Sequence, residues 1–273
     1  MPTTLGNLGF IGAGRMASAL ASGCVAAGLT DAASIHAADP FEPARDGFTA
    51  TIPGAKVTAD NAAVLAACDA VVLAVKPQMM ADVLAGLRDR VEPRHLLVSI
   101  AAGTTLARLA EQLPADTRLV RVMPNTPCLI REGASCFSRG AMATDADAQL
   151  VASLLESVGI AREVDEPLLD AVTGLSGSGP AFIYTAIEAM AAGAVAMGMT
   201  AELALELAAA TARGAAGMIR STGRSPAELR DQVTSPGGTT LAGLQSLEKS
   251  GGAAAFQAAV EAATKRSIEL GKS

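Results

Sequence analysis

Two segments rich in glycine and hydroxyl residues are the places in this 273-residue chain that best suit a small anion. Residues 175–181 read LSGSGPA, and residues 233–240 read VTSPGGTT. Each segment is expected to open a helix, where backbone N–H groups lack partners within the helix and attract negative charge. Small side chains would leave these N–H groups accessible to a ligand. The two segments therefore predict a site for a small carboxylate.

A third glycine-rich turn, GAGRMA at residues 12–17, has the spacing of a dinucleotide-binding turn. It follows an apolar run and precedes a helical stretch, and this context is what makes the motif informative. Gly12 permits the tight turn, Gly14 lets a pyrophosphate approach the backbone, and Ala17 lets helix and strand pack closely. Together with the first two segments, this turn indicates a nicotinamide enzyme that acts on a small carboxylated substrate.

Asp39 ends the next apolar run, at the position where such enzymes contact the adenosine ribose. Its carboxylate can accept hydrogen bonds from the ribose 2′-hydroxyl and would repel a 2′-phosphate, which favours NADH over NADPH. Arg15 and Arg45 lie near in the sequence and would attract that phosphate. Either reduced cofactor, NADH or NADPH, therefore stays open at this point.

Composition and charge argue against several functional classes. The net charge of −6 and the lack of a basic run disfavour a nucleic-acid partner, because nothing would neutralise its phosphates. Charged residues and glycines interrupt the apolar stretches, so no membrane span is expected, and residues 1–7 lack the pattern of a signal peptide. A cytoplasmic protein is therefore predicted. The four cysteines form no Cys-x-x-Cys pair and have no nearby histidine, so they are expected to be small buried residues and no metal site is predicted.

Residues 1–164 alternate apolar runs with helical stretches, which predicts a doubly wound α/β sheet of Rossmann type. The predicted strands are 8–11, 34–38, 56–58, 70–75, 95–100 and 118–123, with possible edge strands at 134–138 and 160–164. The predicted helices between them are 16–27, 61–66, 79–89 and 106–112.

Residues 165–273 show almost no strand signal, and an all-helical domain is predicted. The expected helices are 181–197, 201–219, a short one from the capping box at Ser225 to about Val233, 241–247 and 253–270. Their high content of alanine and glycine allows close approach of backbones. So short a helical domain is expected to bury part of its apolar surface against another subunit, which predicts a homodimer.

Five segments, in this order, resemble the pyrroline-5-carboxylate reductases, the enzymes of the last step of proline biosynthesis. They are residues 10–17, 74–77, 123–127, 170–181 and 233–240, and they span nearly the whole chain. The resemblance implies an N-terminal Rossmann domain and a C-terminal helical domain that interleaves with that of a partner subunit. It implies dimers assembled into a larger ring such as a decamer, and reduction of 1-pyrroline-5-carboxylate to L-proline by NAD(P)H.

By position, the resemblance also implies which residues contact the ligands. The cofactor would contact Ile11, Gly12, Ala13, Gly14, Arg15, Met16, Asp39, Asn61, Ala74, Val75, Lys76, Pro77, Ile100, Ala101 and Ala102. The imino acid substrate would contact Ser235, Gly237, Gly238, Thr239 and Thr240, with Ser176 and Gly177 as the wall beneath it. Asn125 is expected to support the site by orienting loop backbone.

Under this resemblance the chemistry needs little acid–base machinery. A cyclic imine protonated on nitrogen is already electrophilic, so hydride transfer needs positioning and a hydrogen bond at the nitrogen. Thr240 is assigned as the catalytic hydroxyl nearest that nitrogen. Two other classes stay open: a hydroxyacid dehydrogenase, against which the absence of lysine from residues 181–197 counts, and a non-catalytic nicotinamide sensor, which would not need residues 235–240.

Overall fold

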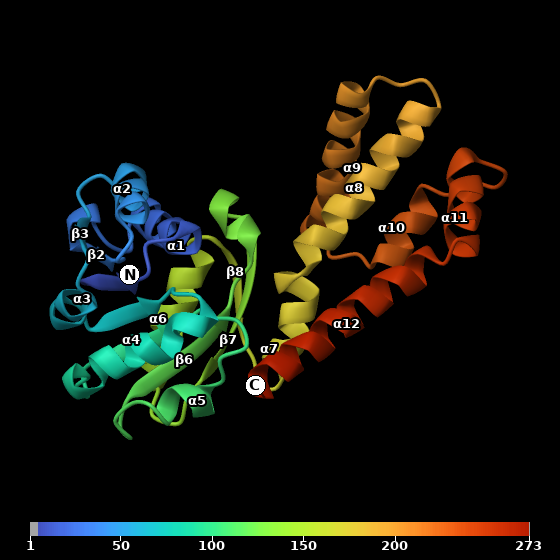
Figure 1. The fold of residues 1–273 in the computed structure, drawn as a ribbon. Helices are drawn as coiled ribbons and strands as arrows, with labels where there is room; N and C mark the ends of the chain where they lie inside the picture. Colours follow the sequence, from blue (N-terminus) through green and yellow to red (C-terminus); the bar gives the residue numbers. More distant parts are fainter. Residues whose placement is uncertain (1–4, 273) are drawn as a thin grey trace. The chain divides into compact units, whose positions relative to one another are not determined.

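The computed structural model describes residues 5–272, so residues 1–4, part of the stretch examined for a signal peptide, lie outside the description. The chain forms two compact units (Figure 1). The first contains the chain up to Ser178 together with the residues from Ala262 onward, and the second is Gly179–Glu261. The first unit therefore extends beyond the division expected at residue 165 and is completed by the C-terminal segment.

The first unit is built around an eight-stranded sheet with the order β3-β2-β1-β4-β5-β6-β7-β8. Neighbouring strands are parallel except for β6 and β7, which are antiparallel. The doubly wound sheet predicted from the sequence is present. Both runs expected as edge strands form strands, but only 160–164 is at an edge, as β8, whereas 134–138 is β7, between β6 and β8. The strands are β1 (Leu8–Ile11), β2 (Ile35–Ala38), β3 (Lys56–Thr58), β4 (Ala70–Leu73), β5 (Leu96–Ser99), β6 (Arg118–Met123), β7 (Gly133–Arg139) and β8 (Gly159–Glu163).

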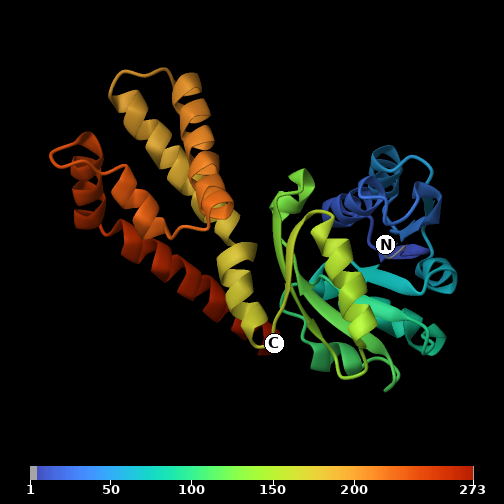
Figure 2. The ribbon, with the colours of Figure 1, turned by 180° about the vertical axis from the view of Figure 1, so that it is seen from behind.

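Helices cover both faces of this sheet, as Figures 1 and 2 show from opposite sides. One group of helices forms an apolar core with one face and a second group forms another core with the opposite face. The first group is α1 (Arg15–Ala26), α2 (Glu42–Thr51) and α6 (Asp145–Glu156), and the second is α3 (Asn61–Ala67), α4 (Met80–Leu87) and α5 (Leu106–Ala110). Burial on both faces explains why the central strands are continuous apolar runs.

Three helices of the first unit, α2, α6 and the short α7 (Leu168–Val172), were not expected from the sequence. Helix α2 completely buries only one residue, Phe48, so no apolar period marks it. Helix α6 begins with a capping box, in which the Thr144 side chain accepts from the Asp147 N–H and the Asp147 carboxylate accepts from the Thr144 N–H. This box has aspartate where glutamate or glutamine is usual, which is why its sequence pattern was not recognised.

Beyond β8 the described chain is helical, as the sequence predicts. At the start of α10 the Ser225 side chain accepts from the Glu228 N–H, and the Glu228 carboxylate accepts from the Ser225 N–H, so the expected capping box is confirmed. The helices are α7 (Leu168–Val172), α8 (Gly179–Ala196), α9 (Ala201–Thr222), α10 (Pro226–Gln232), α11 (Thr239–Lys249) and α12 (Gly252–Lys272).

Helix α8 begins at Gly179, within the glycine-rich segment at residues 175–181, as expected, but the backbone just before it is already helical. Thr173–Gly177 form a π-helical turn between α7 and α8, in which the Ser178 N–H donates to the Thr173 carbonyl at 2.9 Å. Backbone of this segment is therefore engaged within a continuous helical run. The wide turn accommodates Pro180, whose ring would clash with a carbonyl one turn earlier in a regular α-helix.

The same run, Leu168–Ala196, is long and apolar enough to cross a membrane by length and composition, and 6% of its most apolar window is buried within the chain. The expectation that every apolar stretch falls short of a span was therefore wrong here. Exposed side chains on the run include Ile183, Tyr184 and Met190. Apolar surface of this extent marks a contact with another protein or a membrane.

Candidate active site

The dinucleotide turn lies where the carboxyl ends of β1 and β4 meet. Gly12 has a φ of +98°, and a Cβ on it would lie 2.7 Å from the carbonyl oxygen of Ala74, so only glycine fits. The Gly12 N–H donates to the Ala38 carbonyl, and the Ala74 N–H donates to the Ile11 carbonyl, both at 2.7 Å. The tight turn predicted at Gly12 is thus required by conformation and by close backbone approach.

Gly14 leaves the start of α1 open. It is the N-cap residue, no side chain caps the helix, and no heavy atom lies within 4 Å of the place its Cβ would take. The first N–H groups of this helix, and the positive end of its dipole, therefore face free space. Ala17, one turn further on, is completely buried. The arrangement fits a pyrophosphate group.

Asp39 is hydrogen-bonded to this turn. One of its carboxylate oxygens accepts from the N–H of Ala13 and the other from the N–H of Phe41, each at 2.9 Å. Nη1 of Arg45 donates to the carbonyl oxygens of Asp39 (2.9 Å) and Pro40 (3.0 Å). The carboxylate therefore shapes the dinucleotide turn, with a guanidinium on the same loop. Asp39 was expected near the ribose, but its bond to Ala13 is not visible in the sequence.

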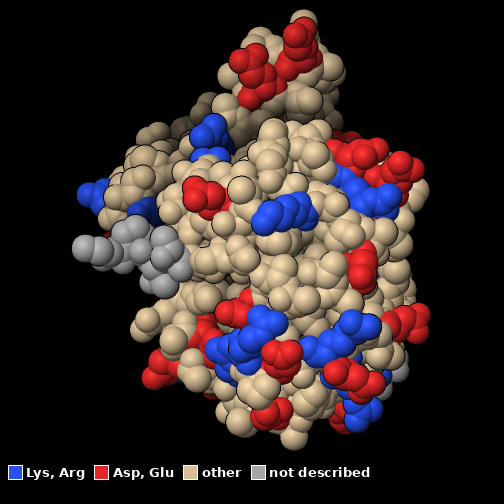
Figure 3. Space-filling view, turned by 90° about the vertical axis from the view of Figure 1, so that its left-hand side faces the viewer, with Lys and Arg blue, Asp and Glu red and all other residues tan. Residues whose placement is uncertain are grey.

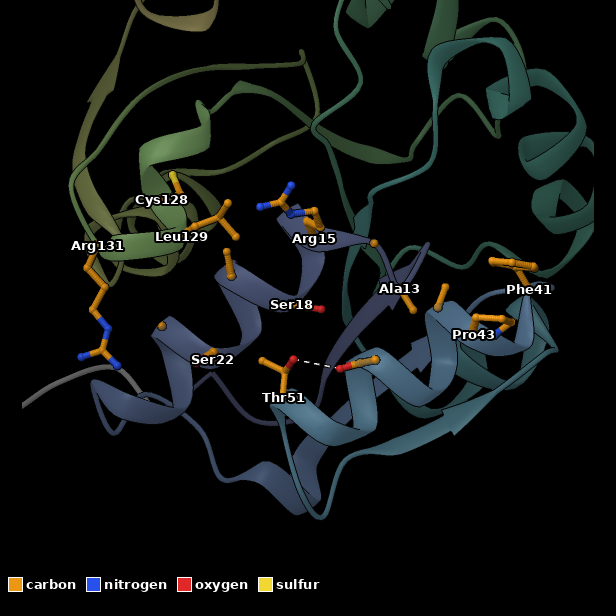
Figure 4. Close-up of a pocket in the computed structure, with 15 residues that line it drawn as sticks. Ala13, Arg15, Ser18, Ser22, Phe41, Pro43, Thr51, Cys128, Leu129 and Arg131 are labelled. Atoms are coloured by element: carbon orange, nitrogen blue, oxygen red, sulfur yellow. Dashed lines mark hydrogen bonds between the residues drawn. The ribbon is translucent and has the colours of Figure 1, made fainter. Parts of the chain in front are cut away.

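A pocket of about 630 Å³ lies beside the turn, between α1 and α2 (Figure 4). Ala13, Gly14 and Arg15 line one end of it together with Phe41, which is 64% exposed. Further along, its lining comes from α1, from α2 and from the short helical turn η4 (Thr126–Ile130): Ser18, Ser22, Thr51, Cys128 and Leu129. Phe41 is a candidate that the sequence analysis missed, because a single aromatic residue before an unrecognised helix forms no motif.

The remaining residues of the predicted cofactor set lie on turns after β3, β4 and β5. Asn61 is the first residue of α3, and Lys76 is exposed and precedes the short helical turn η2 (Pro77–Met79). The Ile100 N–H donates to the Leu73 carbonyl at 3.2 Å. All fifteen residues of the set therefore lie at the edge formed by the carboxyl ends of parallel strands, where such sheets bind ligands.

Ser176 and Gly177 lie against the end of β6, at the same edge of the sheet. A Cβ on Gly177 would lie 2.5 Å from Cε of Met123. The side-chain amide of Asn125 donates to the Ser176 carbonyl at 3.1 Å. These contacts lie within the first unit, so the structure brings Ser176 and Gly177 to the sheet edge that carries the dinucleotide turn.

Residues 235–240 form a tight turn at the start of α11, in the second unit. Gly237 has a φ of +71°, and the Gly238 N–H donates to the Ser235 carbonyl at 3.0 Å. A Cβ on Gly238 would collide with Oγ of Ser235. Gly238 is the N-cap, Thr239 and Thr240 are the first two helical residues, and no side chain caps the helix. The open helix start predicted from the sequence is therefore present at this segment.

Buried thiols and one buried imidazole occupy structural positions in the first unit. Three of the four cysteines are buried, as expected, and the fourth is half-buried. Burial raises the pKa of the Cys24 thiol to about 11 and that of Cys68 to about 12, so both are protonated and weakly nucleophilic at neutral pH. Nδ1 of His95 accepts from the Glu92 N–H at 2.8 Å, and its Nε2 lies 3.0 Å from the Leu65 carbonyl. Burial lowers the pKa of His95, which keeps the ring neutral.

Charged side chains on the surface shown in Figure 3 are mixed in sign, with lysine and arginine interspersed among aspartate and glutamate. A nucleic-acid backbone would be met by a continuous basic patch, and this surface does not present one among its described residues. Within residues 5–272, no group of three or more His, Cys, Asp or Glu side chains is placed to hold a metal ion.

Two family matches and several named relatives cover most of this chain. Residues 166–270 match the family described as pyrroline-5-carboxylate reductase dimerisation, and residues 7–103 match NADP oxidoreductase coenzyme F420-dependent. A curated pyrroline-5-carboxylate reductase from Methanosarcina acetivorans is 48% identical over 97% of this chain and 98% of its own length. The curated protein of that name from Glycine max is 46% identical over 99% of this chain and 98% of its own.

Solved structures show the same likeness. The pyrroline carboxylate reductase of Plasmodium falciparum with NADP bound has a TM-score of 0.88 and 32% identity, covering 98% of this chain and 99% of that one. The pyrroline-5-carboxylate reductase of Coxiella burnetii has a TM-score of 0.92 and 35% identity, covering 98% of this chain and 100% of that one. The similarity therefore extends over both units.

Proposed function

The chain belongs to the pyrroline-5-carboxylate reductase family, and from this premise we propose how its own residues reduce 1-pyrroline-5-carboxylate to L-proline with NAD(P)H. The reaction is the last step of proline biosynthesis. The observation that carries the proposal is that the chain has two open helix starts, at Gly14 for a dinucleotide and at Gly238 for a carboxylate. Residues 1–164 are assigned to the dinucleotide and residues 165–273 to the substrate and to dimerisation.

The dinucleotide is held by the edge of the sheet. N–H groups at the start of α1 bind its pyrophosphate, and Asp39 and Arg45 stand beside the adenosine ribose. The small residues Ala101 and Ala102 leave room for the nicotinamide ring, which supplies the hydride when the cofactor is bound. Phe41 offers an exposed ring next to Asp39 for contact with the adenine.

The substrate is held by the turn at residues 235–240. Backbone N–H groups at the start of α11 bind its carboxylate, because they have no partners within the helix. The Thr240 hydroxyl then forms a hydrogen bond at the ring nitrogen. The imine carbon becomes the electrophile once the nitrogen is protonated, so the enzyme needs position more than a proton relay. Ser176 and Gly177 form the wall on the side of the sheet.

The two alternative classes are less well supported. A hydroxyacid dehydrogenase would use a lysine on the long helix of the helical domain, and α8 contains none. A nicotinamide sensor would have no use for the uncapped turn at residues 235–240. Neither alternative is favoured by a specific observation.

The match to a dimerisation family supports a homo-oligomer, and we extend it to a ring of dimers such as a decamer. In this proposal a second subunit, and not a membrane, covers the exposed apolar residues of α8. A cytoplasmic location and the absence of a nucleic-acid partner stay predictions from the sequence.

The test is turnover of the reduced cofactor. Purified protein is incubated with NADH or NADPH, with and without 1-pyrroline-5-carboxylate, and the reduced-nicotinamide absorbance is followed. We expect its loss only when the cyclic imino acid is present, together with formation of proline. Folded protein that binds the dinucleotide but gives no turnover would overturn the proposed function.

A further inference from the structure

We propose that Asn125 is a positioning residue for hydride transfer, which fixes the Ser176–Gly177 backbone at the carboxyl end of β6. The inference rests on the proposed function and extends it to a residue outside the proposed ligand contacts. Its basis is that the Ser176 carbonyl cannot form its usual α-helical hydrogen bond, because the residue four positions later is proline.

The missing donor follows from the position of Pro180. In an α-helix the carbonyl of one residue accepts from the N–H four residues later. The residue four positions after Ser176 is Pro180, which has no N–H. The donor to the Ser176 carbonyl is instead the side-chain amide of Asn125, at 3.1 Å, from a position fifty-one residues earlier in the chain. Asn125 therefore donates to a carbonyl whose α-helical donor position is occupied by proline.

The other end of the Asn125 amide fixes its orientation. Oδ1 accepts from the Ala134 N–H at 2.9 Å, and because an N–H can only donate, the oxygen must face Ala134 and the nitrogen must face Ser176. Asn125 is 8% exposed. The side chain thus joins the end of β6, the start of β7 and the π turn through two backbone groups.

At the sheet edge the π turn presents its backbone and not its side chains, as two further contacts show. The Ser176 hydroxyl donates back to the Val172 carbonyl at 3.0 Å, within its own helix. A Cβ on Gly177 would lie 2.5 Å from Met123, so the turn packs directly on the end of β6. Loss of the Asn125 bond would let this wall move while the dinucleotide turn, held by Gly12 and Asp39, keeps its shape.

The test is Asn125→Asp, which keeps the size of the side chain and the acceptor for Ala134 but cannot donate to Ser176. We expect kcat with 1-pyrroline-5-carboxylate to fall about tenfold, the effect of roughly one lost hydrogen bond in the transition state. The Kd for NADPH, measured on the free enzyme by fluorescence titration, should change less than about twofold, because the dinucleotide turn does not contact Asn125. Backbone amide exchange at residues 175–179 should become faster.

The matched control is Val122→Ala, which opens a cavity in β6, the strand that ends just before Asn125. Val122 is 1% exposed and lies outside the proposed site. This variant should lower the Tm without lowering kcat or changing exchange at residues 175–179. Wild-type kcat and exchange in Asn125→Asp would overturn the inference. The inference would also be overturned if kcat fell in both variants in proportion to their loss of Tm. If the wild type gives no turnover, the proposed function fails, and unchanged exchange in Asn125→Asp would then overturn the positioning role separately.

Discussion

Among single residues, Asp39 combines a structural and an electrostatic role. Its two carboxylate oxygens accept from the N–H groups of Ala13 and Phe41, so the charge is fixed in place before a cofactor arrives. At the proposed ribose position this charge would repel a 2′-phosphate, whereas Arg45, bonded to carbonyls of the same loop, would attract one. We therefore expect the preference between NADH and NADPH to depend on the balance of two opposite charges on one loop.

Replacing Asp39 by serine should raise kcat/KM for NADPH relative to NADH by about tenfold, or about 1.4 kcal/mol of transition-state binding. The ratio is the quantity to measure, because the absolute values will also reflect the lost bond to Ala13. Arg45→Met is the matched variant and should move the ratio in the opposite direction. A wild-type enzyme that already prefers NADPH by about tenfold would show that the arginine outweighs Asp39.

Thr240 is the other residue on which the proposed chemistry depends, through its hydroxyl. A hydrogen bond to a charged group contributes about 1.5–3 kcal/mol, so Thr240→Ala should lower kcat/KM by about ten- to a hundredfold. Thr240→Ser keeps the hydroxyl and should lose much less. The Kd of the cofactor should barely change in either variant. Equal steady-state activity of Thr240→Ala and wild type would exclude the Thr240 hydroxyl from the mechanism. Only the backbone of residues 237–239 would then remain as the proposed substrate contact.

Among the elements, one buried arginine joins several segments of the first unit. The Arg121 side chain is 6% exposed, and it lies 3.0 Å from a carboxylate oxygen of Glu166 and 3.8 Å from one of Asp170. Glu166 also accepts from the Leu106 N–H at the start of α5, and Asp170 accepts from the Ser267 hydroxyl of α12, both at 2.7 Å. Strand β6 is thus tied to α5, α7 and the end of α12.

Arg121→Met should therefore destabilise the protein by about 3 kcal/mol, because both carboxylates lose their cation in a poorly solvated site. This corresponds to a fall in Tm of roughly 6–12 °C, measured by calorimetry. Arg139 also bridges two carboxylates, Asp145 and Glu163, but these are 90% and 40% exposed. Arg139→Met should cost less than about 1 kcal/mol. Equal losses in the two variants would contradict the role given to burial.

Elements with strong local patterns were predictable, and those defined by tertiary contacts were not. The central strands are apolar along their length because helices cover both faces of the sheet. The helix that begins after Ser225 was recognisable from its capping box. Helix α2 turns only Phe48 fully inward, so its sequence lacks an apolar period. The start of α8 was predictable from the glycine, serine and proline around it, but no local pattern reports the π turn at Thr173–Gly177 just before it.

The candidate site divides in the same way. Gly12, Gly14 and Asp39 are recognisable because each meets a local requirement of dinucleotide binding within a short stretch of sequence. The bond from Asn125 to Ser176 joins residues far apart in the chain, and no local pattern reports it. The same holds for the bond between Asp39 and the Ala13 N–H, although both residues were expected at the cofactor.

For the whole molecule, the second unit has little core of its own. Its cluster of buried apolar residues consists, within the described chain, of Ala191, Ala204 and Ala208. Large apolar side chains such as Met190 and Leu205 are at least half exposed. A unit of this size with so small a core is not expected to be stable alone, and a second subunit is the surface that the family match indicates.

Sedimentation at low micromolar concentration should therefore show no folded species with the mass of one chain. Dilution should lead to loss of helical signal together with dissociation, because the exposed faces of α8 and α9 would meet water. Circular dichroism on the same samples provides the control for folding. A folded monomer under these conditions would refute an obligate homodimer.

The return of the chain to its first unit at Ala262 has a consequence for how the protein is made. The Ser267 hydroxyl binds Asp170, and Leu270 packs against Gly103 beside the loop after β5. These residues are translated after the whole of the second unit, although the sheet that they complete is translated before it. During synthesis the nucleotide-binding half therefore stays incomplete until the second unit has been made. A nascent chain halted before residue 262 would carry every sequence motif named above and an unfinished first unit.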